Sequence, residues 1–164
     1  MENSLAIANY FIKKAQDSEE ELTPMKLIKI VYIANGWYLA LKGEPLIPEK
    51  IEAWKYGPVV KSVYNEFKQY SRGQIDSFYS DHFGVTPMPK DPEIRKFLDK
   101  IWEVYGAYNG LQLSALTHEK DTPWYTTWHD KGGSKCESAI ISNDLIRNHY
   151  KSKLNPVING STTS

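Results

Sequence analysis

The sequence predicts a mainly α protein, a single compact helical domain with a central buried helix and a small β element. Apolar residues recur at helical spacing in several segments, and one segment (22–41) is apolar around nearly its whole circumference. Prolines and glycines separate these segments. With 164 residues, 41% of them hydrophobic, the chain can bury one sizeable core. We assign residues 1–153 to this domain and residues 154–164 to a disordered tail.

Three helix starts carry recognisable capping signals. The first expected helix begins at Ser4 as its N-cap, presents an apolar stripe and runs to about Gln16. Two more helices begin with a capping residue followed by a proline, at Thr23-Pro24 and at Asp91-Pro92. A proline at the first helical position removes no intrahelical hydrogen bond. The helix that starts at Asp91-Pro92 is expected to continue to about Tyr105.

The helix Pro24–Leu41 is expected to organise the core. Lys26 and Lys29 are its only charges, so neighbouring elements must cover it on most sides. Gly36 is expected to allow another helix to cross closely, and Gly43 to end the helix.

A short β element is expected where the helical periodicity stops. Ile51–Trp54 alternates apolar and polar residues, which indicates an extended segment, half of a small hairpin. Gly57-Pro58 breaks this segment, and Pro58 is expected to open a helix over residues 59–70. The buried stripe of that helix comprises Val60, Val63, Tyr64 and Phe67.

The rest of the chain is irregular between short elements. Residues 71–89 predict a loop with, at most, a short strand around Phe83–Val85. The elements expected after residue 105 are a turn at Asn109-Gly110, a helix over 111–118, a helical turn holding Trp124 and Trp128, a strand at Ile140-Ile141 and a last helix, capped by Ser142-Asn143, to about Lys153.

The composition argues against several classes of protein. The 20 basic residues balance the 20 acidic ones, whereas nucleic-acid binders usually carry a basic excess. The single cysteine, Cys136, cannot form an intrachain disulfide, which fits a reducing cytosol. We find no signal peptide, and no apolar run reaches the ~18–20 residues that span a bilayer. The expectation is a cytoplasmic protein without membrane contact, metal site or cofactor.

The best candidate for catalytic chemistry is the cluster of His118, Glu119 and Asp121. In one interpretation His118 is a general base that a carboxylate orients. In the other, Thr117, His118 and Asp121 hydrogen-bond the loop backbone and fix the position of Trp124. We favour the second interpretation, because no nucleophile motif accompanies the cluster. We therefore predict that the protein is not an enzyme and assign no catalytic residues.

Aromatic residues around Gly57-Pro58 admit three interpretations. They could stack on nucleic-acid bases beside a shared lysine face. They could be core residues with a solvated rim. A rigid Gly-Pro corner could also present them to a protein partner. The residues involved are Trp54, Tyr56 and Tyr64, with Lys26, Lys29, Lys55 and Lys61 as the lysine face.

Two ordered motifs resemble the Panacea domain family, which comprises SocA-like antitoxins and phage-associated GepA-like proteins. The resemblance covers about residues 4–150. The first motif comprises Leu22-Thr23, Lys26-Leu27, Lys29-Ile30, Tyr32, Trp37, Gly43, Pro45-Leu46, Glu52-Ala53-Trp54 and Tyr56-Gly57-Pro58-Val59. The second comprises Leu113-Ser114, Leu116-Thr117-His118 and Pro123-Trp124.

The resemblance implies an antitoxin that neutralises a cognate toxin by direct protein–protein binding, with a cytosolic protease as a further partner if the chain acts as a proteolytic adaptor. The alternative is a phage-associated regulator or nucleic-acid-binding module without enzymatic activity. The resemblance assigns no roles residue by residue. Our candidate partner-binding residues are Trp54, Lys55, Tyr56, Gly57, Pro58, Lys61, Ser62, His118 and Trp124.

Overall fold

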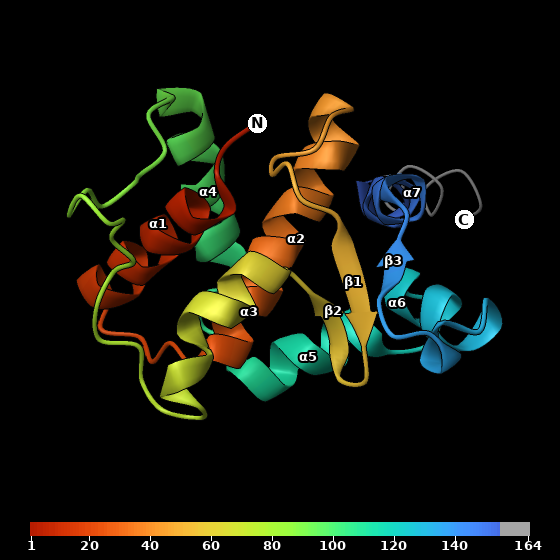
Figure 1. Cartoon of the computed structure of the whole chain (residues 1–164). Helices are drawn as coiled ribbons and strands as arrows, with labels where there is room; N and C mark the ends of the chain where they lie inside the picture. Colours follow the sequence, from red (N-terminus) through yellow and green to blue (C-terminus); the bar gives the residue numbers. More distant parts are fainter. Residues whose placement is uncertain (155–164) are drawn as a thin grey trace.

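The structure, a computed structural model, describes residues 1–154 and confirms a mainly helical fold with a small sheet (Figure 1). The helices are α1 (Ser4–Asp17), α2 (Pro24–Lys42), α3 (Lys61–Phe67), α4 (Pro92–Tyr105), α5 (Gly110–His118), α6 (Pro123–Tyr125) and α7 (Asn143–Leu154). The strands are β1 (Ile51–Trp54), β2 (Gly57–Val59) and β3 (Ala139–Ile141). Leu154, the first residue that we assigned to the tail, is the last residue of α7, and the rest of the predicted tail, residues 155–164, lies outside the described residues. No helix among residues 1–154 is long and apolar enough to cross a membrane.

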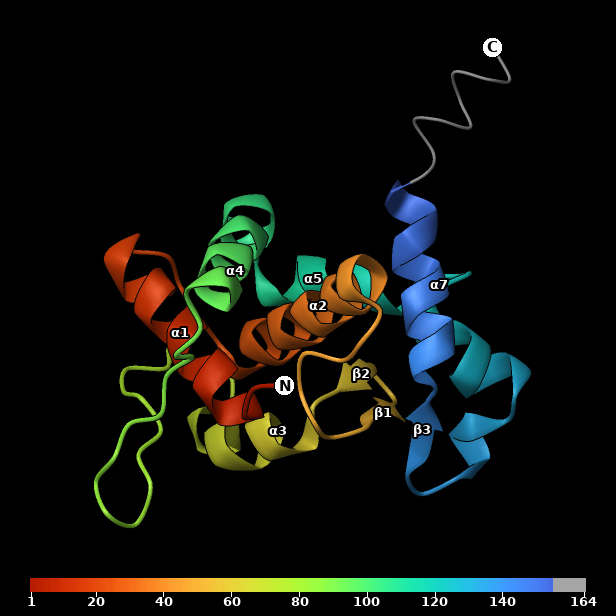
Figure 2. The same ribbon diagram turned by 90° about the horizontal axis from the view of Figure 1, so that it is seen from above.

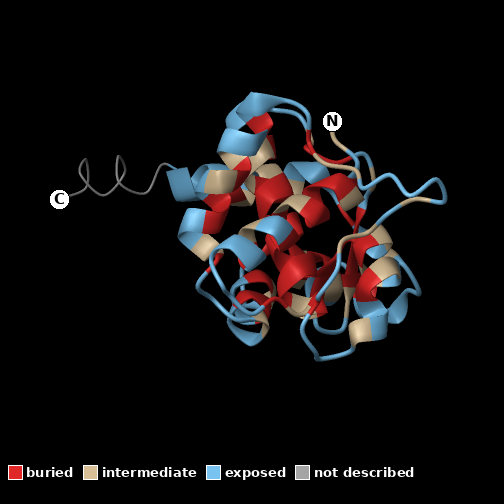
Figure 3. Cartoon of the chain, turned by 90° about the vertical axis from the view of Figure 1, so that its left-hand side faces the viewer, coloured by how far each residue is buried: buried red, intermediate tan, exposed pale blue. Residues whose placement is uncertain are grey.

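Helix α2 occupies the centre of the molecule, as its composition predicts. It contacts α1, α3, α4, α5 and α7, and Figure 2 shows these helices arranged around it. The side-chain oxygen of Thr23 accepts a hydrogen bond from the Lys26 amide at the N-terminus. Gly43 ends the helix in the left-handed region, with φ = 78°. Figure 3 shows the buried residues gathered in the middle of the molecule, with the exposed residues around its periphery.

Local signals place the other helix ends almost where we expect them. The cap of α1 is a correction: the side chain of Asn3, not Ser4, accepts the hydrogen bond from the Leu5 amide. Ser4 is instead the first helical residue and is buried. At α4 the Asp91 carboxylate accepts from the Glu93 amide, and at α5 Asn109 forms a reciprocal capping box with Gln112.

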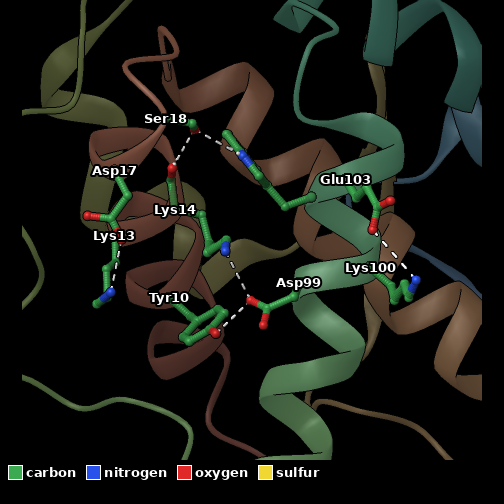
Figure 4. A network of polar contacts seen from close by, with 9 residues as sticks. Tyr10, Lys13, Lys14, Asp17, Ser18, Asp99, Lys100 and Glu103 are labelled. Atoms are coloured by element: carbon green, nitrogen blue, oxygen red, sulfur yellow. Dashed lines mark hydrogen bonds and ion pairs between the residues drawn. The ribbon is translucent and has the colours of Figure 1, made fainter.

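Helices α1 and α4 are joined by a polar network at the edge of the core (Figure 4). The Tyr10 hydroxyl donates to Asp99 at 2.7 Å, and the Lys14 ammonium lies 3.2 Å from the same carboxylate. Trp102 Nε1 donates to Ser18 Oγ at 3.1 Å. Burial, together with the Asp99 hydrogen bond, raises the pKa of Tyr10 to about 12.

The sheet is antiparallel, in the order β2-β1-β3. Ile51–Trp54 is a strand, as predicted, and the strand expected at residues 140–141 pairs with it through Ile51 and Ile141. The prediction that Pro58 opens a helix is wrong, because Pro58 lies within β2, paired with Ala53. Helix α3 begins only at Lys61.

The segment between α3 and α4 contains no strand at Phe83–Val85. A tight turn occupies this place, in which the Asp81 amide donates to the Val85 carbonyl at 2.9 Å. Gly84 adopts φ = 77° within it.

Gly36 is the point at which α7 crosses α2, and it gives a first testable expectation. A Cβ at this position would overlap the ring of Tyr150, which is buried. Helix propensity alone would make Gly36→Ala stabilising by about 1 kcal/mol. Because the ring cannot move away without repacking the core, we expect a net destabilisation of about 1–3 kcal/mol, measured by urea unfolding. In a Tyr150→Val background the same change should cost nothing; an equal cost in both backgrounds would contradict this explanation.

Candidate partner-binding site

The β1–β2 hairpin ends in a two-residue turn, Lys55-Tyr56, between the paired residues Trp54 and Gly57. We call residues 54–57 the hairpin tip. Gly57 has φ = 119°, a conformation that residues with a Cβ rarely adopt. The tip therefore depends on glycine at this position.

Three donors from distant elements hold alternate carbonyls of this hairpin. Trp124 Nε1 of α6 donates to the Trp54 carbonyl at 2.6 Å. Ser114 Oγ of α5 donates to the Tyr56 carbonyl at 3.0 Å. The buried ammonium of Lys29, on α2, donates to the Pro58 carbonyl at 2.8 Å. These hydrogen bonds, from donors on three helices, fix the backbone of the hairpin against the core.

Lys29 lies directly beneath the tip. Its Nζ would be 3.0 Å from a Cβ at Gly57, so the glycine leaves the space that the ammonium occupies. Burial lowers the pKa of Lys29 to about 7, because the charged form loses its hydration. Lys26, one turn earlier on α2, is buried as well: it donates to the Gly106 carbonyl and lies 5.0 Å from the centre of the Trp102 ring.

This burial corrects the interpretation of a shared lysine face. Lys26 and Lys29 point into the core, whereas Lys55 and Lys61 are exposed. The four residues do not form one basic surface, so the structure argues against the interpretation in which they form a lysine–aromatic face for nucleic acid.

The Trp54 side chain bridges the core and the surface. Its Nε1 donates to Glu52 Oε1 at 3.2 Å, and its ring meets the edge of Tyr64 at 4.8 Å between centroids. Trp54 is half-buried. The orientation of the indole is thus set before any partner arrives.

His118 contacts a backbone carbonyl and an aromatic ring rather than an acid. Its Nδ1 contacts the Ser114 carbonyl, and its ring meets the edge of Trp124 at 5.4 Å. Among residues 1–154 no carboxylate forms a hydrogen bond or ion pair with His118, so the arrangement of a base oriented by an acid is not present. The expectation that Thr117 bonds the loop backbone is wrong, because Thr117 donates to carbonyls within α5. Thr122 instead bonds the loop, at the Glu119 carbonyl, and caps α6.

Seven of the nine predicted site residues lie at or against the tip, whereas Lys61 and Ser62 follow β2 at the opposite end of the hairpin, and the nine differ in exposure. Lys55, Tyr56 and Lys61 are exposed; Trp54, Ser62 and His118 are half-buried; Gly57, Pro58 and Trp124 are buried. The amide and hydroxyl of Ser62 are both engaged by the Glu49 carboxylate. The buried members support the tip, and the exposed ones are available to a partner.

Sequence reasoning missed the roles of Glu49, Ser114 and Lys29. The one available signal was a pair of lysines on an otherwise apolar helix. Nothing in the residue types identifies Ser114 as a donor to a carbonyl 58 positions away. No group of three or more metal-ligating side chains occurs in the described part of the chain.

The sequence of this region matches a known family of domains. A family model described as "Antitoxin SocA-like, Panacea domain" matches residues 27–125, which include the hairpin and all three of its donors. The chain therefore belongs to this family of SocA-like antitoxins. Its relative "Antitoxin SocA" from Caulobacter vibrioides (strain NA1000 / CB15N) is 28% identical over 153 residues, which cover 89% of this chain and 81% of that protein. No solved structure matches the chain.

Proposed function

We propose that this chain neutralises a cognate toxin by direct protein–protein binding, and that the hairpin tip with Lys61 makes the contact. The observation that supports the proposal most is the anchoring of three alternate carbonyls, at Trp54, Tyr56 and Pro58, by donors from three helices. A loop held in this way loses little conformational entropy on binding. The proposed role needs no catalytic residue, cofactor or metal.

The side chains at the tip have the chemistry of a protein contact. Tyr56 is 63% exposed, although tyrosine is a large side chain that gains from burial. The Lys55 ammonium lies 5.5 Å from the centre of the Tyr56 ring. A tyrosine beside a lysine suits a partner surface that offers an apolar contact next to a carboxylate.

The wider role follows the family. We place the protein in the cytoplasm and assign residues 1–153 to one antitoxin domain; delivery of the bound toxin to a cytosolic protease is an extension of this proposal. Nucleic acid is the weaker alternative, because two of the four lysines that would contact it are buried.

Replacement of the exposed tip residues tests the proposal. The toxin is first sought by co-expressing the chain with each neighbouring reading frame and scoring growth rescue and co-purification. We expect the triple variant Lys55→Ala, Tyr56→Ala, Lys61→Ala to lose growth rescue and to bind the toxin at least a hundredfold more weakly, because a central aromatic contact and two charges are removed. The thermal midpoint should change little, since all three side chains are exposed.

Lys100→Ala is a matched control, because Lys100 is an exposed lysine on α4, away from the tip. Full rescue by a folded triple variant would show that the contact lies elsewhere. Failure of rescue with every neighbouring frame would contradict the antitoxin proposal itself.

A further inference from the structure

The second exposed aromatic feature lies in the segment between α3 and α4. We call residues 79–87 the finger. Phe83, near its middle, is 92% exposed, more than any other large apolar side chain among residues 1–154, and Val85 beside it is 56% exposed. The segment projects from the body of the molecule and lies away from the hairpin tip in both views (Figures 1 and 2).

The tip of the finger is a structured turn. One carboxylate oxygen of Asp81 accepts hydrogen bonds from the amides of Phe83 at 2.8 Å and Val85 at 2.9 Å. The Gly84 amide donates to the Asp81 carbonyl at 3.0 Å. This is the local pattern by which aspartate stabilises turns, and it fixes the backbone that carries Phe83.

The base of the finger is tied to the core. The buried Asn9 side chain of α1 donates to the carbonyls of Tyr79 and Pro87, both at 2.9 Å, and accepts from the Tyr79 amide at 2.8 Å. Ser80 and Thr86 share a hydrogen bond between their hydroxyls at 2.7 Å. Both limbs are therefore clamped, and no contact within the described residues requires Phe83 at the end of them.

The charge around Phe83 distinguishes between partners. Asp81 is the only aspartate, glutamate, lysine or arginine within the finger, whereas Lys90 follows it and Arg95 donates to the Pro89 carbonyl near its base. An anionic membrane or a nucleic acid at Phe83 would meet the Asp81 carboxylate, with no lysine or arginine of the finger to offset it. An apolar pocket of a protein with basic residues around its rim is complementary to both the phenyl ring and the charge.

We propose that the finger is a second, preformed protein-contact site. It inserts Phe83 into an apolar pocket of a partner protein, and basic residues surround the rim of that pocket. Because hydrogen bonds already hold the backbone before binding, the loss of conformational entropy on binding falls mainly on the Phe83 side chain. The site is separate from the hairpin tip, so it does not depend on the function proposed for that tip.

The experiment uses the full chain with Phe83 replaced by the photoreactive residue benzoylphenylalanine, expressed in its native cells and irradiated. Lys100 replaced in the same way provides the control for surface exposure. The protein that is cross-linked specifically from position 83 is identified by mass spectrometry and purified. It is then titrated against the wild type, Phe83→Ser and Tyr56→Ala, with vesicles of phosphatidylcholine and phosphatidylglycerol (3:1) as a parallel probe.

We expect Phe83→Ser to raise the Kd at least tenfold without altering the thermal midpoint, Tyr56→Ala to change it less than twofold, and no chain to bind the vesicles. The proposal is overturned if no adduct exceeds the Lys100 control, if Phe83→Ser leaves the Kd unchanged, or if vesicle binding depends on Phe83. Equal weakening by Tyr56→Ala would show one shared interface and would overturn the separate site. A failed toxin-rescue experiment alters none of these outcomes.

Discussion

Trp124→Ala is expected to destabilise the protein by about 3–5 kcal/mol, as large aromatic-to-alanine changes in a core do. Trp124 is buried, its ring stacks on Trp128 at 5.6 Å between centroids, and its Nε1 donates to the Trp54 carbonyl. The change creates a cavity and also leaves a carbonyl of the hairpin tip without its donor. Since domains of this size are stable by about 5–15 kcal/mol, the loss is a large share of the total. Urea unfolding followed by far-UV circular dichroism measures it.

The conservative change Trp124→Phe separates packing from hydrogen bonding. It keeps most of the ring but removes the donor, so we expect a cost of about 1–3 kcal/mol from the unpaired Trp54 carbonyl. Amide exchange should accelerate at the tip. Trp128→Phe is the control: Trp128 is half-buried and gives no hydrogen bond to the tip, so its cost should stay below about 1 kcal/mol. Equal costs for the two phenylalanine variants would show that the hydrogen bond does not anchor the tip.

Lys29 is expected to make the free energy of unfolding rise between pH 7 and pH 9. Its pKa is about 7 in the folded chain and 10.5 in the reference unfolded state. In this window the unfolded chain binds a proton that the folded chain has released, and stability rises with pH wherever the unfolded state binds more protons. The slope approaches about 1.4 kcal/mol per pH unit, or about 2 kcal/mol over the window.

Lys29→Met should remove most of this rise; burial also lowers the pKa of Lys26, which contributes in the same direction. Urea unfolding at pH 7, 8 and 9 measures the slope, and pH 9 is the upper limit because unfolded tyrosines ionise near pH 10. Lys42→Met, an exposed change at the end of the same helix, should retain the wild-type slope. A wild-type protein whose stability is flat between pH 7 and pH 9 would refute the assignment of Lys29 as a buried, readily deprotonated amine.

Much of the fold could be predicted because its signals are local. The caps at Thr23 and Asp91 act on amides two or three residues away, and the strand Ile51–Trp54 shows its period within four residues. Gly36 indicated a close helix crossing, although its partner Tyr150 lies more than a hundred positions away. Pro58 misled the prediction, because a proline that can begin a helix can equally occupy an edge strand.

The sequence indicated which two motifs lie near each other, but not how their side chains are arranged. The motif residues around Gly57 and around His118 do meet, yet the sequence could not show which are exposed. That depends on the three donors to the hairpin, which stand 29, 58 and 70 positions from their acceptors. Most helices, several of their ends and the family could be read from the amino-acid sequence, since these rest on short-range hydrogen bonding and on the periodic placement of apolar residues. The burial of Lys29, the exposure of Tyr56 and Phe83 and the support that Trp124 gives to the tip became clear only from the folded chain, because burial depends on what the rest of the chain covers.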